Sequence, residues 1–168
     1  MNKPKLSLIP DYSFKCITDI TPEFLGRVGI KFLMLDLDNT IAAYDEHVLA
    51  DNIFKWISGI QDNGIGLYII SNSTRKNRVK SHSDSIGVSF AIKSQKPSTK
   101  SLLHAMEVSG YSPDASALAG DQILTDTIAA NRTGIVSIIV KPRRFTNPFL
   151  AIRYYLEIPF RAMCKNKY

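Results

Sequence analysis

The sequence predicts an α/β fold in which a mostly parallel sheet is covered by helices on both faces. Two observations predict it. Short apolar runs alternate with amphipathic stretches five times along the chain, which is typical of parallel strands joined by crossover helices. Polar residues follow the ends of several apolar runs, at the edge where open α/β sheets bind ligands. The 168 residues fit one domain, so we expect 1–168 to form a single unit.

The elements follow from apolar periodicity and from the residues that break it. Residues 1–30 predict a mixed lead-in interrupted by prolines, with a short helix from Thr21 or Pro22 towards Arg27. Strands are expected where apolar runs are short and bounded by Gly, Ser or Asp, at 31–36, 66–70, 88–92, 114–119 and 135–140. Helices are expected where apolar residues recur on one stripe, at 50–63, 74–86, 98–109 and 122–133. A basic C-terminal helix and tail, 145–168, is expected to place Asn147 at the N-cap and Pro148 at N1, with its helix ending near 157.

Two carboxylates follow the first expected strand. Asp36 and Asp38 are separated by one leucine, so in extended backbone their side chains point to the same side. Carboxylates that close repel each other unless a cation or a shared proton intervenes, and Mg²⁺ prefers carboxylate and water oxygens. The pair therefore predicts a metal-assisted site for phosphate chemistry.

Other polar residues lie at the ends of later strands. On a phosphomonoester, Asp36 would act as the nucleophile and Asp38 as the general acid and base. Ser71 and the amides that follow it, at a helix N-terminus, would bind phosphoryl oxygens. Lys96 would offset their charge. Asp121 and Asp126 would complete the Mg²⁺ shell.

Several of these residues also have plainer interpretations. Thr40 and Asn72 are assigned to phosphate binding. Thr40 could instead brace the Asp36 loop, and Ser71 with Asn72 could form an ordinary helix N-cap. Asp126, five residues after Asp121, could be only an acid on the face of a helix.

The residues Asp36-x-Asp38-x-Thr40, Ser71, Lys96-Pro97 and Gly120-Asp121-x-x-x-x-Asp126 resemble the four motifs of the haloacid dehalogenase (HAD) superfamily. Further runs are similar to the YqeG family of HAD subclass IIIA, at 33–41, 71–73, 95–97, 120–126, 131–135 and 141–153. Ser73 and Gln95 depart from that family's usual asparagine and lysine, which leaves the shape of the phosphate cradle open.

The resemblance implies a Rossmann-like, three-layer HAD core without a cap domain, a single Mg²⁺ and phosphatase activity. It implies that Asp36, the main-chain carbonyl of Asp38 and Asp121 bind Mg²⁺, and that Ser71 and Lys96 hold phosphate. Related mitochondrial phosphatases act on phosphatidylglycerophosphate. The short spacing between Asp38 and Ser71 also leaves no room for a lid domain, so an open site could accept a phosphate that projects from a large body.

Charge and composition bound the partners. The net charge of +6 suits a phosphorylated substrate, including an anionic lipid. Two cysteines and no apolar stretch of about 20 residues favour a cytoplasmic protein. The segment 145–160, which mixes aromatic and basic residues, is expected to pack on the sheet. The alternative is a peripheral contact with a membrane. The basic residues of 75–80 are expected to form a solvated helix face, and the alternative is that they steer an anionic substrate towards Ser71.

Other functions stay open. The substrate could be a nucleotide, sugar or protein phosphate. A phosphate-accepting receiver domain would carry its acidic pair and its acceptor aspartate on separate strands, unlike Asp36 and Asp38. A non-catalytic module that binds anions or nucleic acid should show one basic stripe with stacking aromatics, but the basic residues here are scattered, so no specific nucleic acid is expected. Nothing in the sequence indicates the oligomeric state.

Overall fold

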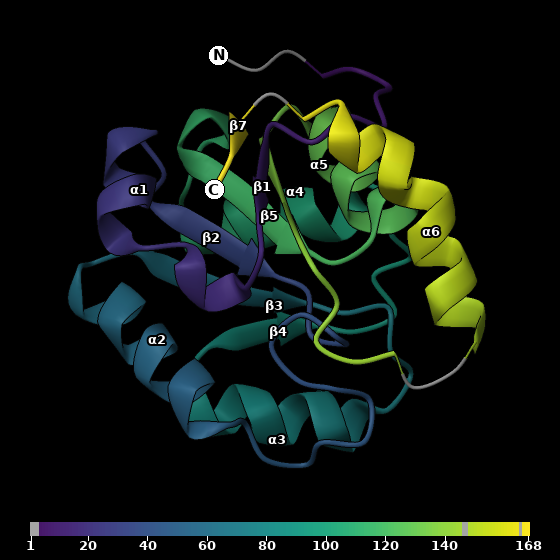
Figure 1. Cartoon of the computed structure of the whole chain (residues 1–168). Helices are drawn as coiled ribbons and strands as arrows, with labels where there is room; N and C mark the ends of the chain where they lie inside the picture. Colours follow the sequence, from purple (N-terminus) through teal and green to yellow (C-terminus); the bar gives the residue numbers. More distant parts are fainter. Residues whose placement is uncertain (1–3, 146–147, 165) are drawn as a thin grey trace.

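The computed structural model describes residues 4–145, 148–164 and 166–168, and its centre is a seven-stranded sheet in the order β4-β3-β2-β5-β6-β1-β7 (Figure 1). Every strand pair in the described residues is parallel. The strands are β1 (Tyr12–Phe14), β2 (Phe32–Leu35), β3 (Gly66–Ile70), β4 (Ser89–Ala91), β5 (Ser116–Gly120), β6 (Val136–Val140) and β7 (Asn166–Lys167). The predicted parallel α/β fold is confirmed.

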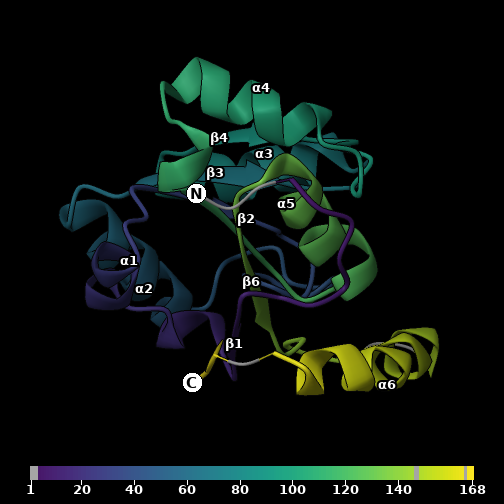
Figure 2. The ribbon, with the colours of Figure 1, turned by 90° about the horizontal axis from the view of Figure 1, so that it is seen from above.

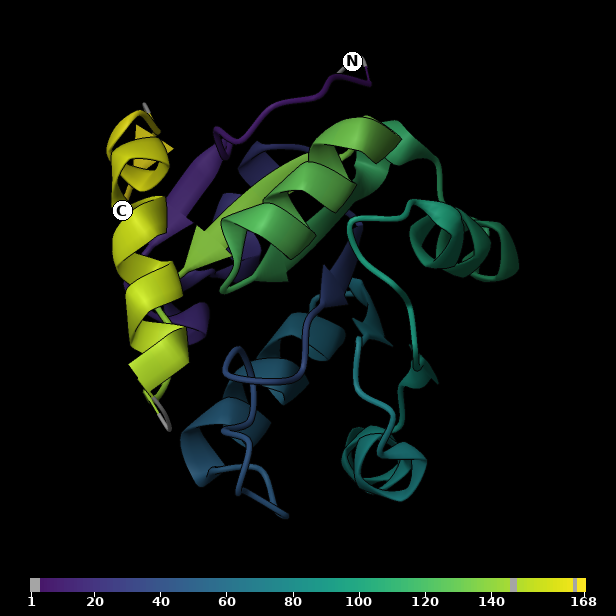
Figure 3. The same ribbon diagram turned by 90° about the vertical axis from the view of Figure 1, so that its right-hand side faces the viewer.

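Helices cover both faces of the sheet, with α2 and α3 on the opposite side from α4 and α5 (Figures 1 and 3). The α-helices are α1 (Pro22–Arg27), α2 (Asp51–Asp62), α3 (Lys76–Ile86), α4 (Lys100–Ser109), α5 (Ile128–Thr133) and α6 (Pro148–Ala162). Short helical turns form at Ile17–Asp19 and Pro113–Ala115, and Ile123–Thr127 forms a π-helical turn that leads into α5. No helix in the described part of the chain is both long and apolar enough to cross a membrane.

The alternation of side chains along β2 creates two cores. Leu33 and Leu35 face a core with α1, α2 and α3, whereas Phe32 and Met34 face a second core with α4 and α5. Because side chains of a strand alternate between faces, a strand buried on both faces must be apolar throughout. All four residues of β2 are buried, and this rigid central strand carries the residues of the site at its carboxyl end.

Two strands were not expected. The lead-in 1–30 contains β1 as well as the expected α1, and β7 forms within the tail. Strand β1 pairs with β7 on one side and with β6 on the other. The helix expected over 122–133 begins as the π-helical turn, and α6 runs five residues beyond its expected end, through Pro159. The predicted N-cap, Asn147, lies outside the described residues.

Candidate active site

Asp36 lies directly after β2 and is held by contacts with three residues. Its backbone N–H donates to the Ala119 carbonyl at 2.9 Å, which continues the pairing with β5. Its Oδ1 lies 2.6 Å from Lys96 Nζ, and its Oδ2 accepts a hydrogen bond from Thr40 Oγ1 at 3.2 Å. The chain reverses at Asn39, whose positive φ of 65° is one that asparagine tolerates better than most residues. The Asp36 carboxylate is therefore buried and fixed in orientation.

Lys96 occupies the centre of the site. Its Nζ also lies 2.8 Å from Asp126 Oδ1 and donates to the Ile70 carbonyl at the end of β3, at 2.7 Å. Asn72 holds the backbone on which this side chain is mounted, because its Oδ1 accepts from Lys96 N at 2.8 Å and its Nδ2 donates to Lys96 O at 3.1 Å. One ammonium group thus joins the ends of β2 and β3 to the π-helical turn that follows β5.

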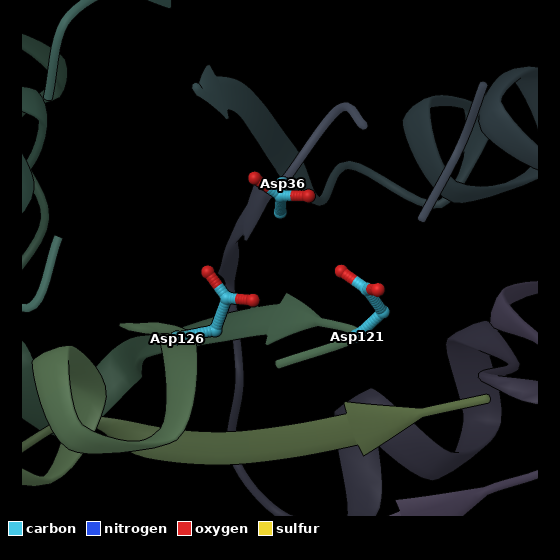
Figure 4. Close-up of side chains that lie close together, drawn as sticks. All are labelled: Asp36, Asp121 and Asp126. Atoms are coloured by element: carbon cyan, nitrogen blue, oxygen red, sulfur yellow. The ribbon is translucent and has the colours of Figure 1, made fainter. Parts of the chain in front are cut away.

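Three carboxylates face a common space (Figure 4), and two of them pair with Lys96. Asp36, Asp121 and Asp126 each offer an oxygen within 4.8 Å of the others, and all three are buried. Asp121 Oδ1 accepts no hydrogen bond from any residue that the structure describes, a state that buried carboxylate oxygens rarely keep. Gly120 makes the cluster sterically feasible, because a Cβ at this position would overlap the Asp126 carboxylate. The donor set suits a hard divalent cation such as Mg²⁺.

Burial and like charge shift the ionisation of the cluster. Burial, with the charges of Asp126 and Asp38, raises the pKa of Asp36 to about 7, although Lys96 opposes the shift. Burial also raises the pKa of Asp121, and Asp36 and Asp126 add to this effect. Burial lowers the pKa of Lys96, but the charges of Asp126 and Asp36 outweigh it and raise that pKa overall. The cluster holds more negative charge than one ammonium neutralises, so a cation would stabilise it.

Asp38 is held by an ion pair with Arg78. Its Oδ1 accepts a hydrogen bond from Arg78 Nη1 at 2.6 Å. Arg78 is buried, and it also donates to the carbonyls of Ala43 and Glu46 at 2.6 and 3.3 Å. The interpretation of this arginine as part of a solvated helix face was wrong, since α3 turns it inward against the catalytic loop.

The remaining predicted residues surround the cluster. Ser71 is buried at the end of β3, where its Oγ accepts from Ser73 N at 3.0 Å. Its hydroxyl hydrogen remains available to a ligand, because that bond uses only an acceptor lone pair. Thr40 braces Asp36, and Asn72 braces Lys96. The phosphate contacts assigned to Thr40, Ser71 and Asn72 stay predictions.

Several residues at the site had not been singled out from the sequence. Tyr44 lies close enough to the cluster that burial, with the charges of Asp38, Asp121 and Asp36, raises its pKa to about 12. Arg153 of α6 lowers the pKa of both Tyr44 and Asp121, and Arg161 of the same helix donates to the Asp121 carbonyl. Of the missed residues, only Arg78 carries a sequence signal: it is four residues before His82 and adjoins the apolar stripe of Val79 and Ile86.

A cavity of about 470 Å³ adjoins Thr40. Its wall combines apolar side chains, including Ile17 and Ile53, with four cations: Lys15, Lys141, Arg143 and Arg144. Two of these cations are paired with carboxylates, Arg143 with Glu46 at 3.2 Å and Arg144 with Asp45 at 3.1 Å. Lys15 and Lys141 add positive charge to the wall of the cavity beside the Asp36 loop.

Sequence comparison identifies relatives over almost the whole chain. A family model described as mitochondrial PGP phosphatase matches residues 1–143. A Bacillus subtilis (strain 168) protein described as "Probable phosphatase YqeG" is 32% identical over 159 residues, which cover 95% of this chain and 91% of the relative.

Solved structures share the fold. The 3-deoxy-D-manno-octulosonate 8-phosphate phosphatase of Moraxella catarrhalis, determined with magnesium and phosphate ions, superposes with a TM-score of 0.52 at 16% identity and covers 83% of this chain and 92% of that one. The cobalt-bound phosphatase YrbI of Haemophilus influenzae gives a TM-score of 0.51 at 12% identity, with coverages of 80% and 90%. The chain belongs to the mitochondrial PGP phosphatase family of the haloacid dehalogenase superfamily, as the four motifs predicted, and it is a phosphoric monoester hydrolase.

Proposed function

We propose that this chain hydrolyses phosphatidylglycerophosphate through an aspartyl-phosphate formed on Asp36. One observation carries the catalytic part: Asp36 is clamped by Lys96 and Thr40 at the end of β2, with oxygens of Asp121 and Asp126 within 4.8 Å. A carboxylate fixed in this way is preorganised to meet a phosphorus atom that binds in front of it.

Mg²⁺ is the proposed metal. Asp36, Asp121 and the main-chain carbonyl of Asp38 would hold it, and Asp126 would contribute directly or through water. The unpartnered Asp121 Oδ1 and the raised pKa values of Asp36 and Asp121 support this assignment. When bound, Mg²⁺ would supply positive charge that stabilises the phosphoryl oxygens in the transition state.

Asp36 and Asp38 divide the reaction between them. An Asp36 oxygen attacks phosphorus and displaces the substrate oxygen, which takes a proton from Asp38 as it leaves. Asp38, now a carboxylate, then accepts a proton from water, and the oxygen of that water displaces Asp36 from phosphorus to release inorganic phosphate. Lys96 and Ser71 would hold the phosphoryl oxygens through both steps. Arg78 would keep Asp38 in place.

The identity of the substrate rests on the family and on the cavity. Phosphatidylglycerophosphate carries a second, diester phosphate close to the phosphate that is removed. The cations of the cavity beside Thr40 suit this second charge. Nucleotide, sugar and protein phosphates lack the acyl chains that would accompany such a headgroup, and they are the comparison substrates in the test.

The test compares kcat/KM across a phosphomonoester panel: dispersed phosphatidylglycerophosphate, a nucleotide, a sugar phosphate, a phosphopeptide and p-nitrophenyl phosphate. We expect the lipid to be preferred, activity to disappear with a chelator and return with Mg²⁺, and Asp36→Asn to remove several orders of magnitude from kcat. Asp114→Asn, at an exposed and remote aspartate, is the matched control. Full activity of Asp36→Asn would refute the nucleophile, and preference for another ester would refute the lipid substrate.

A further inference from the structure

The helix α6 buries charged side chains and exposes apolar ones. The stripe that it turns towards the protein contains Leu150, Tyr154, Glu157 and Arg161, and its two charged members are buried. The exposed residues of α6 carry no charge; they are Pro148, Phe149, Ile152, Tyr155, Leu156, Ile158, Pro159 and Ala162. Phe149 and Leu156 are 70% and 71% exposed. A surface helix normally shows the opposite arrangement.

The buried charges fix this orientation. Glu157 Oε1 accepts from Leu124 N at 3.3 Å, and Glu157 Oε2 lies 3.2 Å from Arg161 Nη2. Arg161 Nη1 donates to the Val140 carbonyl at 3.0 Å, and its Nη2 donates to the Asp121 carbonyl. Rotation of α6 to bury its apolar residues would leave these charges without partners, which is strongly unfavourable. The exposed apolar face is therefore built into the fold.

The same helix borders the catalytic cluster. Arg153 lies near Asn39 and Asp121, and its charge lowers the pKa of Asp121. Figure 2 shows α6 at the margin of the molecule, remote from α4. A surface seated against the outer face of α6 would therefore lie on the far side of this helix from the Asp121 loop, to which Arg161 donates.

We propose that the apolar face of α6, defined by Phe149, Ile152, Tyr155 and Leu156, docks on an anionic lipid bilayer. Exposed Lys141 and Arg144 precede the helix in the sequence, and Arg144 pairs with Asp45 at 3.1 Å. Basic residues next to an apolar helix face are typical of helices that bind membrane interfaces. A second copy of the chain would bring the same cations, and the same net charge of +6, against each other. Anionic headgroups would neutralise them. This inference rests on the proposed lipid phosphatase function.

The test is cosedimentation with vesicles of phosphatidylglycerol and phosphatidylcholine. The double variant Phe149→Ser/Leu156→Ser should bind on the order of a hundredfold more weakly, because each apolar side chain withdrawn from water contributes roughly tenfold. Leu103→Ser/Val108→Ser, at residues of α4 that are 49% and 59% exposed, should bind as the wild type does. Both variants change exposed side chains, so both should fold, which circular dichroism would check.

Activity separates docking from catalysis. The α6 variant should hydrolyse p-nitrophenyl phosphate at the wild-type rate and lose activity only on vesicle-bound lipid. The inference would be overturned if the wild-type protein did not bind the vesicles, or if the α6 variant bound them as tightly as the wild type. Either result would count even if the protein is an active phosphatase. A dimer in sedimentation velocity that the α6 variant dissociates would also overturn it, in favour of a second copy. If the wild-type protein bound vesicles but hydrolysed none of the esters, and the α6 variant lost the binding, the result would support docking and refute the proposed function.

Discussion

Arg78 connects α3 to the residue proposed as the acid and base. It reaches Asp38 at 2.6 Å and the carbonyls of Ala43 and Glu46, so one planar guanidinium fixes both the carboxylate and the loop that carries it. An arginine makes several hydrogen bonds in one fixed geometry, which a lysine cannot reproduce. We therefore regard Arg78 as a positioning residue for Asp38.

Replacing Arg78 by Ala should slow the hydrolysis of substrates whose leaving oxygen must be protonated. We expect kcat for an alkyl phosphate to fall by about tenfold or more, since positioned acid–base catalysis contributes roughly 10²–10⁴-fold. The kcat for p-nitrophenyl phosphate should fall less, because nitrophenolate leaves without a proton. The ratio of the two rates is the measurement.

Lys76→Ala, at an exposed residue of the same helix, provides the control and should leave the ratio unchanged. An equal loss on both esters in the Arg78 variant would contradict a role in positioning Asp38 and would indicate general damage to the loop.

Single residues were predictable to different degrees. Asp36, Asp121 and Lys96 each follow an apolar strand, so parallel topology alone gathers them at one edge of the sheet. Arg78 was missed because a cation on a polar helix is usually solvated. Tyr44, Arg153 and Arg161 come from a loop and a terminal helix, and their position depends on tertiary packing that no local pattern encodes.

At the scale of elements, α6 clamps the loop that carries Asp121. Arg161→Met should destabilise the protein by about 3–5 kcal/mol, because Glu157 would be left buried without its partner. Glu157→Leu/Arg161→Met should recover part of this loss, since an apolar pair needs no counter-charge. Urea unfolding of the single and double variants measures the coupling.

Ala162→Ser, at an exposed position of α6, should leave the unfolding midpoint where it is. If the free energy of unfolding lost in the double variant equalled the sum of the losses in the two single variants, Glu157 and Arg161 would not be coupled, and the prediction would be wrong.

The elements that were predicted well are those with long apolar periodicity. Helix α2 repeats Ile53, Ile57 and Ile60 on one face, and its bounds shifted by one residue at each end. Strands β1 and β7 have three and two residues, too few to show a period of two. The length of α6 was underestimated because a proline such as Pro159 usually marks the end of a helix. In the structure Arg161 donates hydrogen bonds to the carbonyls of Val140 and Asp121, and these bonds hold the last turn of α6.

For the molecule as a whole, the buried carboxylates make stability depend on pH. The pKa of Asp36 is about 7 in the folded protein, against about 3.9 for an unfolded aspartate. The folded state therefore binds more protons between these values, so the free energy of unfolding should fall as pH rises from about 4 to 7. The raised pKa of Asp121 adds to this fall. Urea unfolding with a chelator, from pH 5 to 8, should show the decline.

Mg²⁺ should reverse much of that decline at pH 8, because it supplies the missing counter-charge. Asp121→Asn should flatten the pH dependence in chelator and weaken the effect of Mg²⁺, while Asp114→Asn should retain both. A wild-type protein whose stability in chelator is flat with pH would refute the charge imbalance in the cluster.

The outermost pairing of the sheet joins distant parts of the sequence. Tyr12 and Ser13 of β1 align with Asn166 and Lys167 of β7, and β7 follows directly on the helix that clamps the Asp121 loop. During translation the first strand must therefore wait, with one edge unpaired, until residue 167 has been made. The Asp121 loop likewise gains its hydrogen bond from Arg161 only near the end of synthesis, so a nascent chain that already contains all four motifs still lacks the helix that holds Asp121.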